Sequence, residues 1–210
     1  FSDGHYVGDM LNKRGRWRRH GIGTFTWTTG GVFKGDWVDD KRQGFGIYTH
    51  GNGKKYEGGW RNNLFHGEGI LYEVNGNNYS GEFKDGKMNG RGHYKYQYGQ
   101  EYDGDWKDGK RHGKGVNKFI GGRYEGEWSD GKEHGKGTHT YSNGERYEGE
   151  WSDGKKHGKG THTYSNGERY EGEWSDYEKH GKGTYTYSNG DRYEGEWSDG
   201  EKHGKGTYTW

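Results

Sequence analysis

A pattern of aromatic residues and glycines, repeated nine times, constrains this sequence more than any other feature. Each unit begins with a Tyr or Phe that is followed two residues later by Gly, and successive units lie 27, 23, 23, 23, 22, 23, 23 and 23 residues apart. The first residues of the units are Tyr6, Phe33, Tyr56, Tyr79, Tyr102, Tyr124, Tyr147, Tyr170 and Tyr193. A fixed period of about 20 to 50 residues indicates an array of units that pack on their neighbours. We therefore expect residues 1–210 to form one continuous array of about nine 23-residue repeats.

The composition favours strands and turns over helices. The chain holds 46 Gly, 10 Trp, 19 Tyr and 7 Phe, only 14 aliphatic hydrophobic residues, and no Ala, Pro or Cys. Gly costs about 1 kcal/mol at an interior helix position, and Ala and Leu are nearly missing, so a helical domain is not expected. No apolar run approaches the roughly 20 residues of a membrane-spanning helix. The absence of Cys excludes disulfides and Cys-based zinc or redox sites.

Each unit reads as two short strands joined by a tight turn. In the unit that starts at Tyr147, YEGEW alternates and THTY is rich in strand-forming residues. Asp153-Gly154 is typical of a two-residue hairpin turn, and Ser165-Asn166-Gly167 of a three-residue loop closed by Gly. The expected fold is all-β: an elongated, single-layer antiparallel sheet of stacked β-hairpins.

A two-residue turn at Asp153-Gly154 fixes an expected register. It places Trp151, Gly149 and Tyr147 opposite Lys156, Gly158 and Gly160, so that one face is aromatic and glycine-rich and the other polar. Because directly opposed side chains lie on one face, Lys159 is expected on the polar face between Glu148 and Glu173.

Three units depart from the pattern. The first is four residues longer, which predicts Met10 opposite Arg19 and a protruding tip at Arg14-Gly15. The fifth is one residue shorter, so Ile120-Gly121 is expected to be a two-residue loop. Tyr177 stands where the other turns mostly carry Gly, and we expect a distorted turn there.

The pattern resembles the MORN repeat (membrane occupation and recognition nexus). The residues that carry this resemblance in the sixth unit are Tyr124, Gly126, Trp128, Gly131, Gly135, Gly137 and Gly144. The resemblance implies stacked β-hairpins in a curved, grooved sheet. It also implies a scaffold or adaptor without catalytic activity, as found at membrane junctions, in radial spokes of ciliary axonemes and in other cytoskeletal complexes. Some members are instead regulatory segments of larger enzymes, such as lipid kinases, and that alternative stays open.

The recurring polar residues do not predict an enzyme. The histidines that recur once per repeat would lie about 9.5 Å apart, too far to share one metal ion. The HGKG stretches lack the spacing of a phosphate-binding loop. Paired carboxylates such as Glu148 and Glu150 recur on an open face, without a pocket that would separate their pKa values. We expect no catalytic residue, no metal site and no cofactor.

The aromatic face is the first candidate for partner binding, because exposed aromatic patches usually mark interaction sites. Sequence variation between repeats is largest before residue 120, which favours this region for recognition of a helical or extended partner segment. The predicted groove residues are Phe25, Trp27, Trp37, Tyr48, Trp60, Leu71, Phe83, Tyr94, Tyr96, Trp106, Phe119 and Trp128.

The first hairpin is a second candidate, for anionic partners. Residues 1–55 hold 10 basic and 5 acidic side chains, a net charge of +5, whereas residues 124–210 carry −6. The basic tip contains Lys13, Arg14, Arg16, Trp17, Arg18 and Arg19. A solvated loop and a contact with an acidic protein tail or an acidic phospholipid both fit this charge run.

Residues 1–5 are read as the tail of a preceding repeat, so the sequence is interpreted as a segment of a longer protein. We expect a cytoplasmic, cytoskeleton-associated protein, with a cilium or flagellum axoneme as one setting. The expected partners are proteins, including neighbouring subunits of a large assembly. Nucleic acid is not expected. Open sheet edges favour end-to-end or homo-oligomeric pairing.

Overall fold

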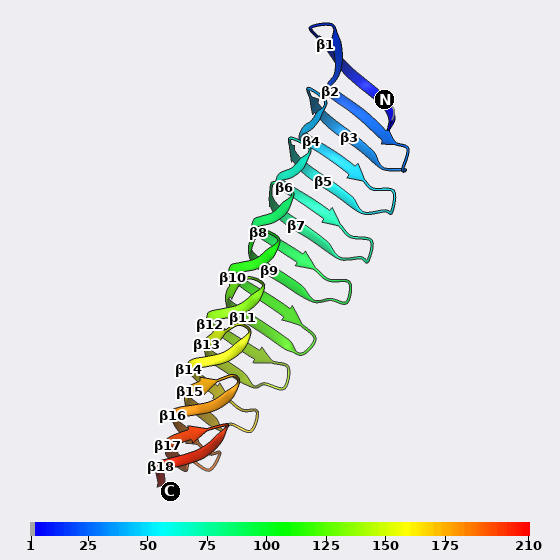
Figure 1. The fold of residues 1–210 in the computed structure, drawn as a ribbon. Coiled ribbons are helices and arrows are strands. Elements are labelled where there is room, and N and C mark those ends of the chain that lie inside the picture. Colours follow the sequence, from blue (N-terminus) through cyan, green and yellow to red (C-terminus); the bar gives the residue numbers. More distant parts are fainter. Residues whose placement is uncertain (1–2) are drawn as a thin grey trace. The chain divides into compact units, whose positions relative to one another are not determined.

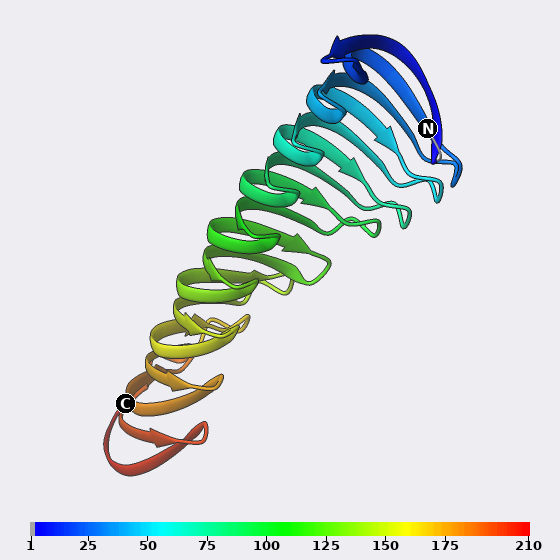
Figure 2. The same cartoon turned by 45° about the horizontal axis from the view of Figure 1, so that its top comes forward.

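The computed structural model describes residues 3–210 and divides them into two units, one up to Lys110 and one from Arg111 onward. The described residues form eighteen strands of one antiparallel sheet, and each repeat contributes one hairpin (Figure 1). The strands of each hairpin are visibly curved (Figure 2). Among residues 3–210, no helix has the length and apolar character needed to cross a membrane.

The first unit contains nine strands, each paired with its neighbours in sequence. They are β1 (Gly4–Lys13), β2 (Arg16–Trp27), β3 (Val32–Val38), β4 (Lys41–Thr49), β5 (Lys55–Arg61), β6 (Leu64–Tyr72), β7 (Asn78–Lys84), β8 (Lys87–Lys95) and β9 (Glu101–Lys107). Phe1 and Ser2 of the predicted tail lie outside the described residues, and Gly4 and His5 extend β1 by pairing with Trp27 and Thr26.

The second unit has the same sequential pairing. Its strands are β10 (Lys110–Phe119), β11 (Gly122–Ser129), β12 (Lys132–Tyr141), β13 (Arg146–Ser152), β14 (Lys155–Thr163), β15 (Arg169–Ser175), β16 (Glu178–Thr186), β17 (Arg192–Ser198) and β18 (Glu201–Thr209). The expected all-β sheet of hairpins is therefore confirmed.

The turn inside each hairpin has the predicted two residues. Asp153 and Gly154 have φ values of 51° and 83°, as a type I′ turn requires. The distorted turn expected at Tyr177 is wrong. Tyr177 has a φ of 75° and the flanking pair Ser175–Glu178 is kept, so this bulky residue accepts the same left-handed conformation.

The loops between hairpins also follow the sequence. Tyr164 N–H donates to Glu168 O at 2.9 Å, and Gly167, at φ 86°, donates to Tyr164 O at 3.0 Å. These bonds close the predicted three-residue loop with Gly in the left-handed region. In the short unit, Phe119 pairs with Gly122, which confirms the two-residue loop Ile120-Gly121.

The first hairpin has the predicted extension. Met10 lies opposite Arg19, and the strands remain paired as far as Lys13 and Arg16. Arg14 and Gly15, with φ values of 55° and 79°, form the tip. The four extra residues therefore lengthen the hairpin without exchanging its faces.

The predicted register inside the hairpin is correct only next to the turn. Trp151 pairs with Lys156, but Gly149 pairs with Gly160 and Tyr147 with His162, because two extra residues of β14 form a bulge. Tyr147 explains this shift: its hydroxyl donates to Glu150 O at 3.0 Å, and its ring lies where a Cβ on Gly160 would be, at 2.4 Å from the hydroxyl oxygen.

An insertion of two residues preserves parity, so the predicted faces are correct. We call the side that carries Tyr147, Gly149 and Trp151 the ring face, and the side that carries Glu148 and Glu150 the open face. Tyr147 and Trp151 are buried, whereas Glu148 and Glu150 are exposed.

The predicted surroundings of Lys159 are half right. Lys159 lies opposite Glu173 of the next repeat, as expected. The position opposite Glu148 is taken by Thr161, and Glu148 forms its ion pair with Arg146 at 2.6 Å. The bulge moves Lys159 away from the strand that carries Glu148.

Candidate protein-binding surface

The core of the ring face is an interlocked stack of aromatic rings. The Tyr147 ring centroid lies 5.1 Å from that of Trp151 in its own repeat and 5.3 Å from that of Trp174 in the next, both edge to face. Trp174 Nε1 donates to Gly160 O at 3.1 Å. Each Trp thus reaches back over the preceding glycine row, so each repeat completes the packing of its neighbour.

The twelve predicted groove residues fall into two groups. Those that are buried form the packed core: Phe25, Trp37, Trp60, Leu71, Phe83, Trp106 and Trp128. Those that remain half-buried are Trp27, Tyr48, Tyr94, Tyr96 and Phe119, and we call these five the ring row. Among the predicted groove residues, only the ring row offers surface to a partner.

The ring row contains two contacting pairs in the first unit and one residue, Phe119, in the second. In the first unit, the centroids of Trp27 and Tyr48 lie 5.5 Å apart, and those of Tyr94 and Tyr96 lie 4.6 Å apart. Asn77 Nδ2 donates to the Tyr94 hydroxyl at 3.2 Å, which fixes that ring. In the second unit, the Phe119 centroid lies 5.3 Å from that of His139. Held rings lose little conformational freedom on binding.

In each unit, cationic side chains pack against the aromatic rings, and the sequence analysis assigned these cations no role. Arg42 lies over the Trp60 ring at 4.2 Å and Arg111 over the Trp128 ring at 4.2 Å, measured to the centroids. Desolvation by burial lowers the pKa of Lys156 to about 8. The sequence analysis could have found these cations, because it paired Trp151 with Lys156 and directly opposed residues share a face. These cations stabilise the stack as cation–π partners.

The basic first hairpin does not present six free cations. Lys13 pairs with Asp39 at 2.9 Å, and this hydrogen bond lowers the pKa of the Asp39 carboxyl. Arg19 lies over the Trp37 ring at 4.4 Å and contacts Asp40 at 3.3 Å. Arg18 is half-buried. The exposed part of the predicted cluster is therefore Arg14, Arg16 and Trp17, together with the ion-paired Lys13.

The histidines lie on both faces: His157, one of those that recur once per repeat, is exposed opposite Glu150, whereas His162 stands at another position of the same repeat, opposite Tyr147. His162 on the ring face is buried, and desolvation together with Lys156 and Lys179 lowers its pKa to about 4. Its Nε2 lies 3.6 Å from Glu145 Oε2, beyond hydrogen-bond distance, so burial outweighs that carboxylate. Within residues 3–210, no group of three or more His, Asp or Glu side chains is placed to hold a metal ion.

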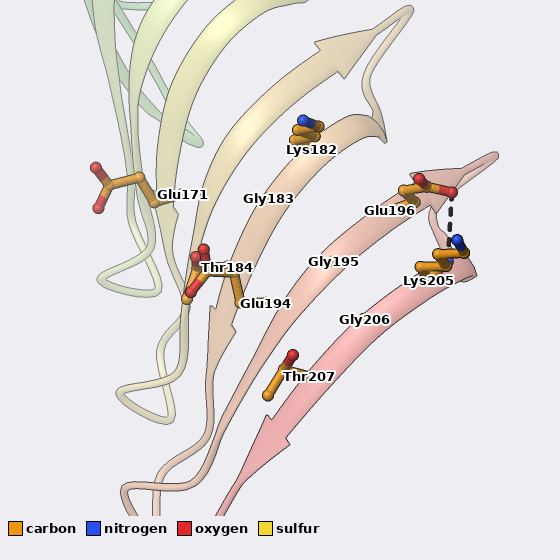
Figure 3. A pocket seen from close by; sticks show the side chains of 10 residues that line it. All are labelled: Glu171, Lys182, Gly183, Thr184, Glu194, Gly195, Glu196, Lys205, Gly206 and Thr207. Atoms are coloured by element: carbon orange, nitrogen blue, oxygen red, sulfur yellow. Dashed lines mark hydrogen bonds between the residues drawn. The ribbon is translucent and has the colours of Figure 1, made fainter.

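The open face is hollowed over the paired glycines of the second unit. One hollow, of about 740 Å³, is lined by Lys, Thr and Glu around Gly183, Gly195 and Gly206 (Figure 3). Two further hollows, of about 510 and 490 Å³, repeat this lining one and two repeats earlier. Glu196 Oε2 accepts a hydrogen bond from the Lys205 backbone N–H at 3.3 Å, so the carboxylate braces the bulge.

The repeat geometry described above agrees with a family model for the MORN repeat. It matches residues 18–32, 33–55, 56–77, 79–99, 102–117, 124–146, 147–169, 170–192 and 193–210. The chain belongs to the MORN repeat family. Eight of these nine matches begin at a residue given by the aromatic spacing. The first begins at Arg18, inside the lengthened hairpin, instead of at Tyr6.

Solved structures give more distant likenesses to this MORN protein. The TCP10 domain of Danio rerio CPAP, solved with a peptide of STIL, is 10% identical, with 97% of this chain and 99% of that chain covered and a TM-score of 0.34. The TCP domain of SAS-4 from Drosophila melanogaster, solved with a proline-rich motif of Ana2, is 12% identical, with 80% and 84% covered and a TM-score of 0.29. No curated protein sequence matches the chain.

Proposed function

We propose that this MORN array is a non-enzymatic scaffold that binds helical or extended segments of partner proteins along its ring face. The observation that carries the proposal is the ring row, in which half-buried Trp, Tyr and Phe side chains lie beside the buried aromatic core. Rigid, amphipathic rings of this kind dominate the energy of protein interfaces.

The setting that we propose follows from the family alone. MORN proteins act as adaptors in cytoskeletal assemblies, so we propose a cytoplasmic, cytoskeleton-associated protein, with the ciliary axoneme as one location. Fluorescent tagging of the protein in ciliated cells tests this. Exclusion of the tag from both axoneme and cytoskeleton would contradict the setting and leave the binding proposal in place.

The binding proposal is tested by changing the ring row without disturbing the buried aromatic core. Tyr48→His and Tyr94→His introduce the residue that His139 and His162 provide at the same position of later repeats. We expect this double variant to fold and to lose most of the proteins captured by the wild-type array from cell extract. Direct titration of the main captured protein should then show at least a tenfold weaker Kd, since two aromatic anchors are removed. Equal affinity would refute a role for the ring row.

A second candidate is a membrane-surface function through the first hairpin. The observation that favours it is Trp17, which is 61% exposed at the tip beside Arg14 and Arg16. Trp and cations together suit an interface with anionic lipids. Flotation with vesicles that contain phosphatidylserine or a phosphoinositide should be lost in Arg14→Glu/Arg16→Glu and at high salt. Absence of flotation in the wild type would reject this candidate.

A further inference from the structure

The aliphatic side chains of this protein are concentrated away from its core. All 14 precede residue 121, and the buried core is aromatic except for Leu71. Alternation in the paired strands places eight of the others on the open face of the first three repeats. These eight are Val7, Leu11, Ile22, Val32, Val38, Ile47, Leu64 and Ile70.

The centre of this surface is strongly exposed. Ile22 is 65% exposed, Val7 is 63% exposed and the neighbouring Phe45 is 55% exposed. Ile47 and Ile70 are half-buried and lie opposite Glu57 from its two sides. We call Val7, Ile22, Phe45, Ile47 and Ile70 the apolar open-face patch. Along the paired strands these residues alternate with Thr24, Lys34 and Glu57. Exposed apolar residues gathered on one face in this way indicate an interaction site.

The fold does not require these residues. At the positions of Ile22 and Phe45, the later repeats carry Lys136, Lys159 and Lys182, and the backbone pairing is the same. At the positions of Ile47 and Ile70, later repeats carry Thr. The same backbone is therefore compatible with a polar open face, so the apolar patch is not explained by folding.

The charges around the patch select an acidic partner. Lys34 is exposed and lies between Thr24 and Ile47, and Arg16 is exposed on the same face at the hairpin tip. Three carboxylates of this face are engaged within the chain: Asp9 accepts from Ile22 N–H at 3.0 Å, Asp36 accepts from Phe45 N–H at 2.8 Å, and Glu57 pairs with Lys55 at 3.0 Å. Lys34 and Arg16 therefore remain to meet the charges of a partner, while Asp9 and Asp36 hold the backbone of the patch and Glu57 is neutralised by Lys55.

We propose that the apolar open-face patch binds an acidic amphipathic α-helix of a partner protein. Successive repeats are about 9.6 Å apart, and two turns of a helix rise about 10.8 Å. Apolar residues at i, i+3, i+4 and i+7 therefore meet equivalent sites in adjacent repeats, and about 13 residues span all three. Carboxylates on one flank of the helix pair with Lys34 and Arg16. This proposal rests on the proposed protein-binding function but uses the face opposite the ring row.

The test uses a synthetic peptide of about 18 residues, fluorescein-labelled, with Leu at the i, i+3, i+4, i+7 spacing and Glu on its flanks. Fluorescence polarisation measures its binding to the whole chain. The variant Phe45→Lys/Ile47→Thr copies the later repeats and should weaken binding at least tenfold. The control Ile120→Lys removes an apolar loop residue that is more exposed than Phe45, at 84% against 55%, and should change binding less than twofold. A peptide with Lys in place of Glu should bind at least tenfold more weakly.

Equal binding by wild type and Phe45→Lys/Ile47→Thr would overturn the proposal, as would equal binding of the acidic and basic peptides. A dimer in sedimentation velocity that Phe45→Lys abolishes would assign the patch to a second copy of the chain instead. Flotation on phosphatidylserine vesicles that the same variant abolishes would assign it to a membrane. If the acidic peptide does not bind but Tyr48→His/Tyr94→His still reduces partner affinity, this inference fails and the proposed function stands.

Discussion

The two units fold the same repeat with different side chains. Residues 3–110 contain twelve of the chain's 14 aliphatic residues, whereas the second unit contains only Val116 and Ile120. Both units keep the buried Tyr or Phe, the buried Trp or Phe, and the paired glycines. The comparison separates the residues that make the fold from those that the fold leaves free, and the free positions of the first unit are where recognition is expected.

The largest predicted effect tests the shared core. Trp60→Ala in the first unit and Trp174→Ala in the second should each cost about 3–5 kcal/mol, because each removes a buried ring. Both also lose a hydrogen bond from Nε1 to a glycine carbonyl, of 3.0 Å to Gly46 and 3.1 Å to Gly160. Urea denaturation, monitored by amide hydrogen exchange in each unit, measures the two losses in the free energy of unfolding. Trp60→Phe should cost less, because Phe83 fills the same place in another repeat. Costs that differ by more than about 2 kcal/mol would break the equivalence of the two cores.

Substitution of the glycines that lie against the buried rings should give the next largest effect. A Cβ on Gly46 would lie 2.4 Å from Phe33 Cζ, and one on Gly160 2.4 Å from the Tyr147 hydroxyl oxygen. Because those rings are enclosed, Gly46→Ala and Gly160→Ala should each cost up to about 3 kcal/mol. In the control Gly154→Ala, the new Cβ meets no atom within 4 Å. Its only cost is the strain of a non-glycine residue at φ 83°, about 1 kcal/mol. Thermal unfolding of the three variants should rank them in this way. A larger loss of stability in Gly154→Ala would show that the close contact of glycines with the rings is not what stabilises the core.

These glycines also show which parts of the fold could be predicted from the sequence. The repeat period, the turn at Asp153-Gly154 and the alternation of faces follow from local chemistry, and all three are confirmed. The bulge opposite Gly149 was missed, because an insertion of two residues keeps parity and leaves the pattern of faces unchanged. It results from the room that the Tyr147 ring needs, which is a contact between strands and not a property of either one.

The candidate site was less predictable than the fold. The sequence identifies aromatic residues but not their burial, which depends on how the Trp of one repeat covers the glycines of the previous one. Trp60 therefore belongs to the core, while Tyr48 remains half-buried. The apolar open-face patch, by contrast, left a signal. Phe45 occupies the repeat position of Lys159, which was expected on the polar face, but the sequence analysis did not use this.

The buried His162 should make the stability of the second unit sensitive to acid. His162 is 7% exposed, and burial lowers its pKa from 6.5 to about 4. The stability that comes from the neutral ring is therefore fully present above pH 6.5 and is lost as the pH falls toward 4. Partial hydration reduces the loss to about 1–2 kcal/mol between pH 7 and 4.5. The corresponding positions of the first unit hold Phe25, Tyr48, Leu71 and Tyr94, which do not take up a proton in this range.

The matched variant is His162→Tyr, because Tyr185 occupies the same position one repeat later. It should remove most of the acid sensitivity of the second unit and leave the first unit unchanged. Hydrogen exchange at pH 7 and pH 4.5, resolved by residue, measures both. An unchanged acid response in the variant would show that another group, such as His139, is responsible.

The smallest predicted effect decides how the comparison is interpreted. Ile22→Lys and Phe45→Lys should change the free energy of unfolding by less than about 0.5 kcal/mol, since both sites are exposed and the later repeats carry Lys there. The reciprocal Lys136→Ile and Lys159→Phe should be equally neutral. Thermal denaturation of all four variants measures this. A loss of 2 kcal/mol or more in Phe45→Lys alone would mean that the first unit needs its aliphatic face to fold. Neutral stability would leave binding as the reason why nearly all aliphatic residues of this chain lie in its first unit.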